Sequence, residues 1–108
     1  MLAKTPIGTR FYRWVAAQPP EREYQPALST DCACGCFMQD EFGISREDAA
    51  RSFSNYFHEM GYGEPIYSHT DPSLVDFWRE FNGIAVVGES TYGALRQRLE
   101  ARMPEVVA

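Results

Sequence analysis

Helix start and stop signals recur along this chain, and no other feature constrains its fold as strongly. Proline suits the first position of a helix, where its missing N–H would have no partner, and Ser, Thr or Asp side chains cap the N–H groups that follow. Five segments begin with such a signal: Thr5-Pro6, Ser29 to Asp31, Ser45, Asp71-Pro72 and Ser90. Apolar residues at helical spacing follow each of them, so we expect five helices.

Stop signals set the lengths of these helices, because proline cannot continue a helix and glycine accepts the left-handed conformation that ends one. They are Pro19-Pro20, Gly43, Gly61, Asn82-Gly83 and Pro104. The chain should therefore form a mainly α, compact bundle of about five helices. Its 108 residues have room for one domain, and we expect a single helical domain over 1–108.

The apolar run from Ile84 to Val87 lies between the fourth and fifth expected helices. It follows Gly83 and is closed by Gly88, so it predicts a short strand or a buried extended link. A lone strand would have only a copy of itself to pair with. We expect at most one short strand or small hairpin, and a homodimer is compatible with this pattern.

Three cysteines stand at alternate positions, Cys32, Cys34 and Cys36, where the expected second helix is apolar on all sides. A helix of that kind is buried. The first interpretation is packing, in which the thiols act as small hydrophobic groups while Ala33 and Gly35 let another helix come close. Thiols this close together cannot frame a secreted disulfide domain, which favours a reducing, cytoplasmic compartment.

A Cys₃His zinc site is a second interpretation, with His58 or His69 as the fourth ligand. The spacing disfavours it, because residues on a helix are about 100° apart and Cys34 would point away from Cys32 and Cys36. We expect no cofactor.

A third interpretation makes Cys32 a nucleophile, since the N-terminus of a helix favours the thiolate. The sequence pattern D-C at 31–32, F at 37 and F-G-I at 42–44 resembles that of the cysteine peptidases of the NlpC/P60 type, in which the catalytic cysteine lies at the start of a buried helix. That resemblance implies a hydrolase with a base histidine on a strand. His58 falls in an expected helix and His69 in an expected loop, so a protein without enzymatic activity is favoured and a cysteine-dependent enzyme stays open as the alternative.

The net charge of −5 is unevenly distributed along the chain. Residues 31–90 carry eleven Asp and Glu against three Arg, whereas both ends are slightly basic. An acidic middle repels phosphate backbones, because nucleic-acid binding depends on clustered basic side chains. We expect no direct nucleic-acid binding, and a protein partner with a basic surface. The longest apolar run is far too short to cross a membrane, so no membrane partner is expected.

The candidate partner-binding residues lie in this acidic middle, because aromatic anchors framed by charge are typical of protein interfaces. They are Asp40, Glu41, Glu47, Asp48, Tyr62, Glu64 and Tyr67. The four acids flank one helix–helix junction, and the other three residues lie in the expected loop from 61 to 71. Trp78 is a further ring that we expect to be exposed.

Three segments together resemble a class of small proteins encoded by bacteriophages and prophages. They are F-Y-R-W-V-A-A-Q-P-P-E-R-E-Y at 11–24, D-C-A-C-G-C-F at 31–37 and T-Y-G-A-L-R-Q-R-L-E at 91–100. The chain departs from that class at Cys34 and Cys36, where an aliphatic residue and a glutamine are usual. The resemblance implies an accessory protein that acts in the host cytoplasm by binding and blocking a host protein, as anti-CRISPR inhibitors of host defence do.

Overall fold

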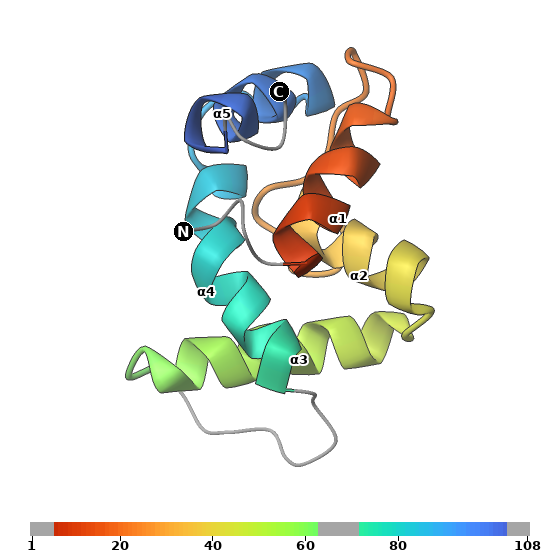
Figure 1. Ribbon diagram of the computed structural model, residues 1–108. Helices are drawn as coiled ribbons and strands as arrows, with labels where there is room; N and C mark the ends of the chain where they lie inside the picture. Colours follow the sequence, from red (N-terminus) through yellow and green to blue (C-terminus); the bar gives the residue numbers. More distant parts are fainter. Residues whose placement is uncertain (1–5, 63–71, 104–108) are drawn as a thin grey trace.

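The computed structural model describes residues 6–62 and 72–103, which form five α-helices (Figure 1). The helices are α1 (Pro6–Ala16), α2 (Ala33–Phe42), α3 (Arg46–Glu59), α4 (Pro72–Val86) and α5 (Tyr92–Arg102). In the described residues, β structure is limited to one isolated bridge between Glu23 and Thr91. The radius of gyration is 13.2 Å, close to the value of about 13 Å expected for a compact domain of 100 residues. The predicted helical bundle is confirmed.

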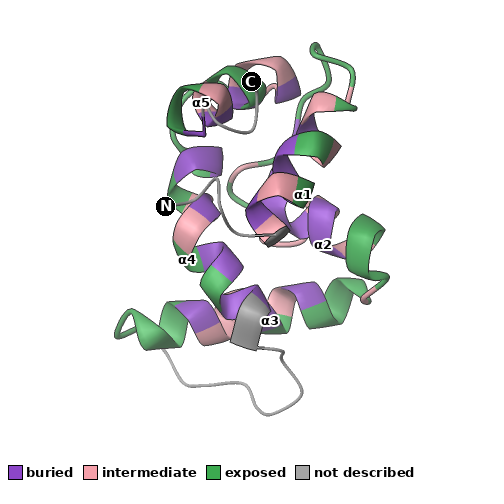
Figure 2. Cartoon of the chain, viewed as in Figure 1, coloured by how far each residue is buried: buried purple, intermediate pink, exposed green. Residues whose placement is uncertain are grey.

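The helices enclose one core, which is centred on Phe11. α1 packs against α5, α3 crosses the start of α4, and α2 contacts α1, α3 and α4 (Figure 1). The buried parts of the helices face this common interior (Figure 2). The ring of Phe11 meets Phe37 of α2 at a centroid distance of 5.1 Å, and Phe77 and Phe81 of α4 at 5.0 Å each. Edge-to-face contacts of this kind add to the stabilisation from burial.

α4 runs through the segment for which the sequence predicted a strand or extended link, so that prediction is wrong. Ile84 and Ala85 are buried and continue, at helical spacing, the core-facing side that includes Phe81. Gly83 does not take the left-handed conformation that would end a helix; Gly88 does, with φ 102°. Burial against the core therefore outweighs the strand preference of β-branched residues.

Side chains from two distant parts of the chain hold the C-terminal end of α4. The Arg98 guanidinium donates to the carbonyl oxygens of Ile84 (3.1 Å) and Glu89 (3.0 Å) and to the Tyr24 hydroxyl (3.0 Å). The Tyr24 hydroxyl in turn donates to the carbonyl oxygen of Ala85 at 2.6 Å. These bonds satisfy carbonyl groups that have no partner within the helix, and they tie the connector between α1 and α2 to the end of α4.

The predicted helix ends are correct in part. Ser45 caps α3, and Gly43, with φ 62°, ends α2 as expected. α2 begins on Cys32 rather than on one of the polar residues at 29–31. α5 is capped by Thr91, one residue after Ser90.

Trp78 is fully buried, so its predicted place among exposed aromatic residues is wrong. Its indole N–H donates to the hydroxyl of Ser52 at 2.8 Å, and that hydroxyl donates to the carbonyl oxygen of Ala49 at 2.8 Å. Ser52 is itself completely buried. The buried interface between α3 and α4 thus contains a polar contact, in which Ser52 accepts the hydrogen bond of the Trp78 indole N–H.

Replacing Ser52 with alanine should lower the free energy of unfolding by about 2 kcal/mol, because the buried Trp78 N–H loses its acceptor. Urea denaturation measures the change. Ser54→Ala is the matched control, since among the described residues the Ser54 hydroxyl bonds the carbonyl oxygen of Ala50 in its own helix. Equal effects of the two substitutions would contradict a specific role for the Ser52–Trp78 bond.

Candidate functional site

Cys32 is held at the N-cap of α2 by the backbone around it. Its N–H donates to the carbonyl oxygen of Leu28 at 2.8 Å. Its sulfur accepts a hydrogen bond from the N–H of Gly35 at 3.4 Å, and its S–H group donates to the carbonyl oxygen of Ser29 at 3.8 Å. The side chain is 1% exposed. A thiol at this position takes over the capping role that Ser or Asp usually has.

The absence of a side chain at Gly35 lets the connector pack directly against the start of α2. A Cβ atom at Gly35 would overlap the carbonyl oxygen of Ser29 and would also crowd Thr30. The sequence predicted that Gly35 allows close approach of another helix. The approaching segment is instead the connector that precedes α2.

The three thiols differ in ionisation and in access. Hydrogen bonding from Cys34, helped by the Gly35 N–H, lowers the pKa of Cys32, although burial opposes this shift. Burial raises the pKa of Cys34 well above its usual range and also raises the pKa of Cys36. Cys34 is completely buried, whereas Cys36 is partly exposed. The cysteine most disposed to form a thiolate is therefore closed to a substrate.

The histidines do not complete a metal-binding group with the cysteines in the described part of the chain. His58 lies exposed on α3, and His69 lies outside the described residues. Within 6–62 and 72–103, no group of three or more His, Cys, Asp and Glu side chains could hold a metal ion. The zinc interpretation thus lacks a ligand set there.

Tyr92 is the neighbour of Cys36 on the facing helix. It is 1% exposed, and its ring packs against Trp14 and Tyr24 at centroid distances of 5.5 and 5.1 Å. Its hydroxyl is buried and makes no regular hydrogen bond among the described residues; the thiol of Cys36 interacts with it. Burial raises the pKa of Tyr92, so the hydroxyl is a permanent donor at neutral pH.

Replacing Tyr92 with phenylalanine should raise the free energy of unfolding by about 1 kcal/mol, because it removes a buried hydroxyl that has no proper partner. Tyr24→Phe removes the same atom from a hydroxyl that donates to Ala85 and accepts from Arg98. That variant should lose about 1 to 2 kcal/mol. Thermal and urea denaturation of both variants measure the contrast, and a loss of stability in both would contradict this account.

The four predicted acids come together at the turn between α2 and α3. Asp40 and Glu41 lie in the last turn of α2, Glu47 and Asp48 lie in the first turn of α3, and all four are exposed. The left-handed conformation of Gly43 makes the turn between them. We call these four residues the acidic corner.

Neighbouring side chains offset part of the charge of the acidic corner. Arg51 pairs with Asp48 at 3.2 Å and more loosely with Glu47 at 3.9 Å. Asp40 accepts a hydrogen bond from the indole N–H of Trp14 at 3.2 Å. Exposed pairs like these contribute little, roughly 0.5 kcal/mol each. These contacts therefore hold the carboxylates only weakly.

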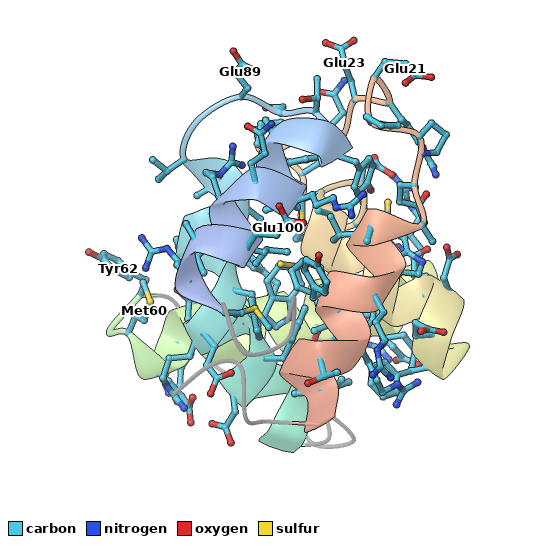
Figure 3. The ribbon with its side chains drawn as sticks, turned by 45° about the horizontal axis from the view of Figure 1, so that its top comes forward. Glu21, Glu23, Met60, Tyr62, Glu89 and Glu100 are labelled. Carbon is cyan, nitrogen blue, oxygen red and sulfur yellow. The ribbon has the colours of Figure 1, made fainter. Side chains whose placement is uncertain are left out.

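Tyr62 lies at the opposite end of α3 from the acidic corner. A helix of 14 residues is about 21 Å long, so the structure does not bring Tyr62 together with the four acids. Tyr62 is 57% exposed, and Phe57 and Met60 beside it are 40% and 49% exposed. We call these three residues the aromatic edge; Figure 3 shows Met60 and Tyr62 projecting from the molecule. Glu64 and Tyr67 lie outside the described residues.

A chain of aromatic ring contacts connects the rings of the aromatic edge to the core. Tyr62 lies 5.1 Å from Phe57, Phe57 lies 5.3 Å from Phe53, and Phe53 meets the buried Trp78 at 4.9 Å, all as centroid distances. The sequence does not reveal this feature, because Phe57 continues an apolar stripe at helical spacing and such a stripe is typical of the side of a helix that faces the core. The stripe extends beyond the point where α4 covers it.

A second group of acids was also missed by sequence analysis. Glu21 and Glu23 in the connector and Glu89 in the link between α4 and α5 project from the same edge of the molecule, and all three are exposed (Figure 3). The bridge between Glu23 and Thr91 brings the two segments together. Only the fold could reveal this proximity, since the segments lie more than sixty residues apart.

No protein-family model matches the chain, and no curated protein or solved structure shows significant similarity to it. None of the helices in the described part is long and apolar enough to cross a membrane.

Proposed function

We propose that this protein is a binding module that attaches to a host protein through the exposed side of α3. The observation that carries the proposal is the aromatic edge, in which Phe57, Met60 and Tyr62 are 40% to 57% exposed although the two rings, Phe57 and Tyr62, continue the ring contacts of the core. Exposed large apolar side chains that form a contiguous patch are typical of interaction sites.

The ring contacts behind the aromatic edge favour affinity. Interface hot spots are enriched in aromatic residues that enter pockets on the partner. Tyr62 packs on Phe57, Phe57 stacks on Phe53, and Phe53 meets the buried Trp78 edge-on, so the positions of the two exposed rings are largely fixed before binding. Side chains that are already ordered lose less conformational entropy in a complex.

The charge on this side of the molecule favours a basic partner. The acidic corner lies at the start of α3, and Glu59 lies at its end beside the aromatic edge. Arg79 bridges Glu59 to Asp76, which leaves the local balance negative. Complementary charge accelerates association and discriminates against acidic proteins.

The resemblance to bacteriophage and prophage proteins suggests the setting of this binding. We propose that the chain is an accessory protein that occludes a working surface of a host machine, in the manner of an anti-CRISPR inhibitor. This part of the proposal is supported by the resemblance of 11–24, 31–37 and 91–100.

Affinity capture from a bacterial host lysate tests the proposal. The wild-type protein should retain a stoichiometric host protein, and the double variant Phe57→Ala, Tyr62→Ala should lose it. Val87→Ala is the control, because Val87 is 67% exposed just past the far end of α4 and shares a pocket with Arg98 and Arg102. Retention by the double variant, with loss in the control, would contradict the assignment of the surface.

The lowered pKa of Cys32 at the start of α2 is the one observation that favours a second candidate, a cysteine-dependent hydrolase; it ranks second because the Cys32 side chain is only 1% exposed. Cys32→Ser separates the two functions, since serine is itself a strong N-cap and should preserve the helix. We expect Cys32→Ser to capture the same host protein as the wild type and to retain the phage phenotype. Loss of the phenotype in a folded variant that still binds would favour the hydrolase.

A further inference from the structure

Cys36 is the only one of the three thiols with appreciable solvent access. All three are free, and Cys32 and Cys34 are 1% and 0% exposed, whereas Cys36 is partly exposed. A small solute can therefore reach Cys36 while the other two remain closed. Its position in α2 is fixed by a backbone hydrogen bond of 2.9 Å from its N–H to the carbonyl oxygen of Cys32.

Tyr92 places a donor without a proper acceptor against this thiol. Its hydroxyl is buried, makes no regular hydrogen bond among the described residues, and interacts with the side chain of Cys36. A buried hydroxyl without a partner is costly, so such a group in a folded protein calls for an explanation. A sulfur atom is a weak acceptor, but an oxygen atom bound to that sulfur is a strong one.

We propose that Cys36 is an oxidation site, at which a hydroperoxide converts the thiol to a sulfenic acid and the Tyr92 hydroxyl donates a hydrogen bond to the new oxygen. The ligand chemistry that the site accepts is thus a small peroxide, and the product is a modified cysteine on the surface of α2. This inference is independent of the proposed binding function, because it concerns neither the acidic corner nor the aromatic edge.

The reaction balances with the hydroperoxide as oxidant. The Cys36 thiolate attacks the terminal oxygen of the peroxide, an S–O bond forms and the O–O bond breaks. The leaving alkoxide, or hydroxide from hydrogen peroxide, takes up the proton that the thiol released and departs as an alcohol or as water. Sulfur loses two electrons and the peroxide gains them.

The groups around Cys36 act on its thiolate in opposite directions. Burial is the largest influence and raises the pKa of Cys36, as do the charges of Cys32 and Asp31; Tyr92 and Arg22 lower it. The thiolate is the reactive species. The rate of oxidation should therefore increase as the pH rises above neutrality.

The test treats the full chain with hydrogen peroxide in the presence of a 1,3-diketone that traps sulfenic acids, followed by peptide mass spectrometry. We expect the adduct on Cys36. Tyr92→Phe should lower the rate of trapping about tenfold, the factor expected for one hydrogen bond that is made only as the S–O bond forms. This variant keeps its fold on our account, because it removes a hydroxyl that stabilises nothing in the reduced protein.

Two variants control the test. Tyr12→Phe removes a hydroxyl that bonds Glu100 at 2.7 Å on another part of α5, and it should leave the rate unchanged. Cys32→Ser removes the neighbouring thiol, which competes with the trap by condensing with the sulfenic acid to a disulfide, and it should raise or preserve the yield of adduct on Cys36. An adduct on Cys32 or Cys34 in place of Cys36 would overturn the proposal, as would equal rates for Tyr92→Phe and the wild type.

Discussion

Replacing Phe11 with alanine should lower the free energy of unfolding by about 4 kcal/mol, which is the range expected when a buried aromatic ring is deleted and a cavity remains. Phe11 is fully buried and its ring touches Phe37, Phe77 and Phe81. Deleting it removes contacts to α2 and α4 at once. Urea denaturation followed by circular dichroism measures the change.

Phe57→Ala is the matched control for this experiment, since it removes the same atoms from a ring that is 40% exposed. It should lower the stability by only about 1 kcal/mol, because less apolar area returns to water. Similar losses at the two positions would show that the core is not centred on Phe11.

Replacing Gly35 with alanine should be nearly as damaging, with an expected loss of about 3 kcal/mol from overpacking. The added Cβ would overlap the backbone carbonyl oxygen of Ser29, and a backbone group cannot turn aside as a flexible side chain can. The connector would have to move away from α2, which would also disturb the N-cap at Cys32. The melting temperature and the α-helical circular dichroism signal report the change.

Gly83→Ala is the matched control, and it should stabilise the protein although it is also a glycine-to-alanine substitution within a helix. A Cβ at Gly83 meets open space in α4, and alanine is a better helix former than glycine, so this variant should gain about 0.5 to 1 kcal/mol. A gain at both glycines would contradict the close packing of the connector on α2.

Local signals predicted most of the fold correctly because helix ends depend on nearby residues. Ser45 and Gly43 were identified from their own chemistry, and the structure confirms both. The start of α2 was harder, because Ser29, Thr30 and Asp31 are all good caps and cysteine is an uncommon one. The position of the N-cap depends on the packing of the connector against Gly35, which the capping preferences of single residues do not reveal.

The error at Ile84 to Val87 has a similar cause. β-branched residues after a glycine are typical of a strand, but α4 continues through Gly83 because Ile84 and Ala85 face the core. The end of the helix is fixed by Arg98 and Tyr24, and neither residue is close to it in sequence. No local pattern could have predicted that cap.

The candidate site divides in the same way. The acidic corner could be predicted, because its four acids are adjacent across one short turn. The burial of Trp78 and the exposure of Phe57 could not, because both depend on how far α4 extends along α3. A helical stripe indicates which side of a helix is apolar, whereas the neighbouring helix decides how much of that side is covered.

The dissociation constant of the captured host protein for two variants tests the central claim most directly. Titration calorimetry should show binding weakened at least about tenfold by Phe57→Ala, Tyr62→Ala, as expected for the loss of an interface hot spot, and unchanged by Val87→Ala. Urea denaturation should show that both variants are fully folded under the conditions of the titration. Unchanged affinity in the double variant, with binding lost in Val87→Ala, would place recognition at the far end of α4 and contradict a binding surface on α3.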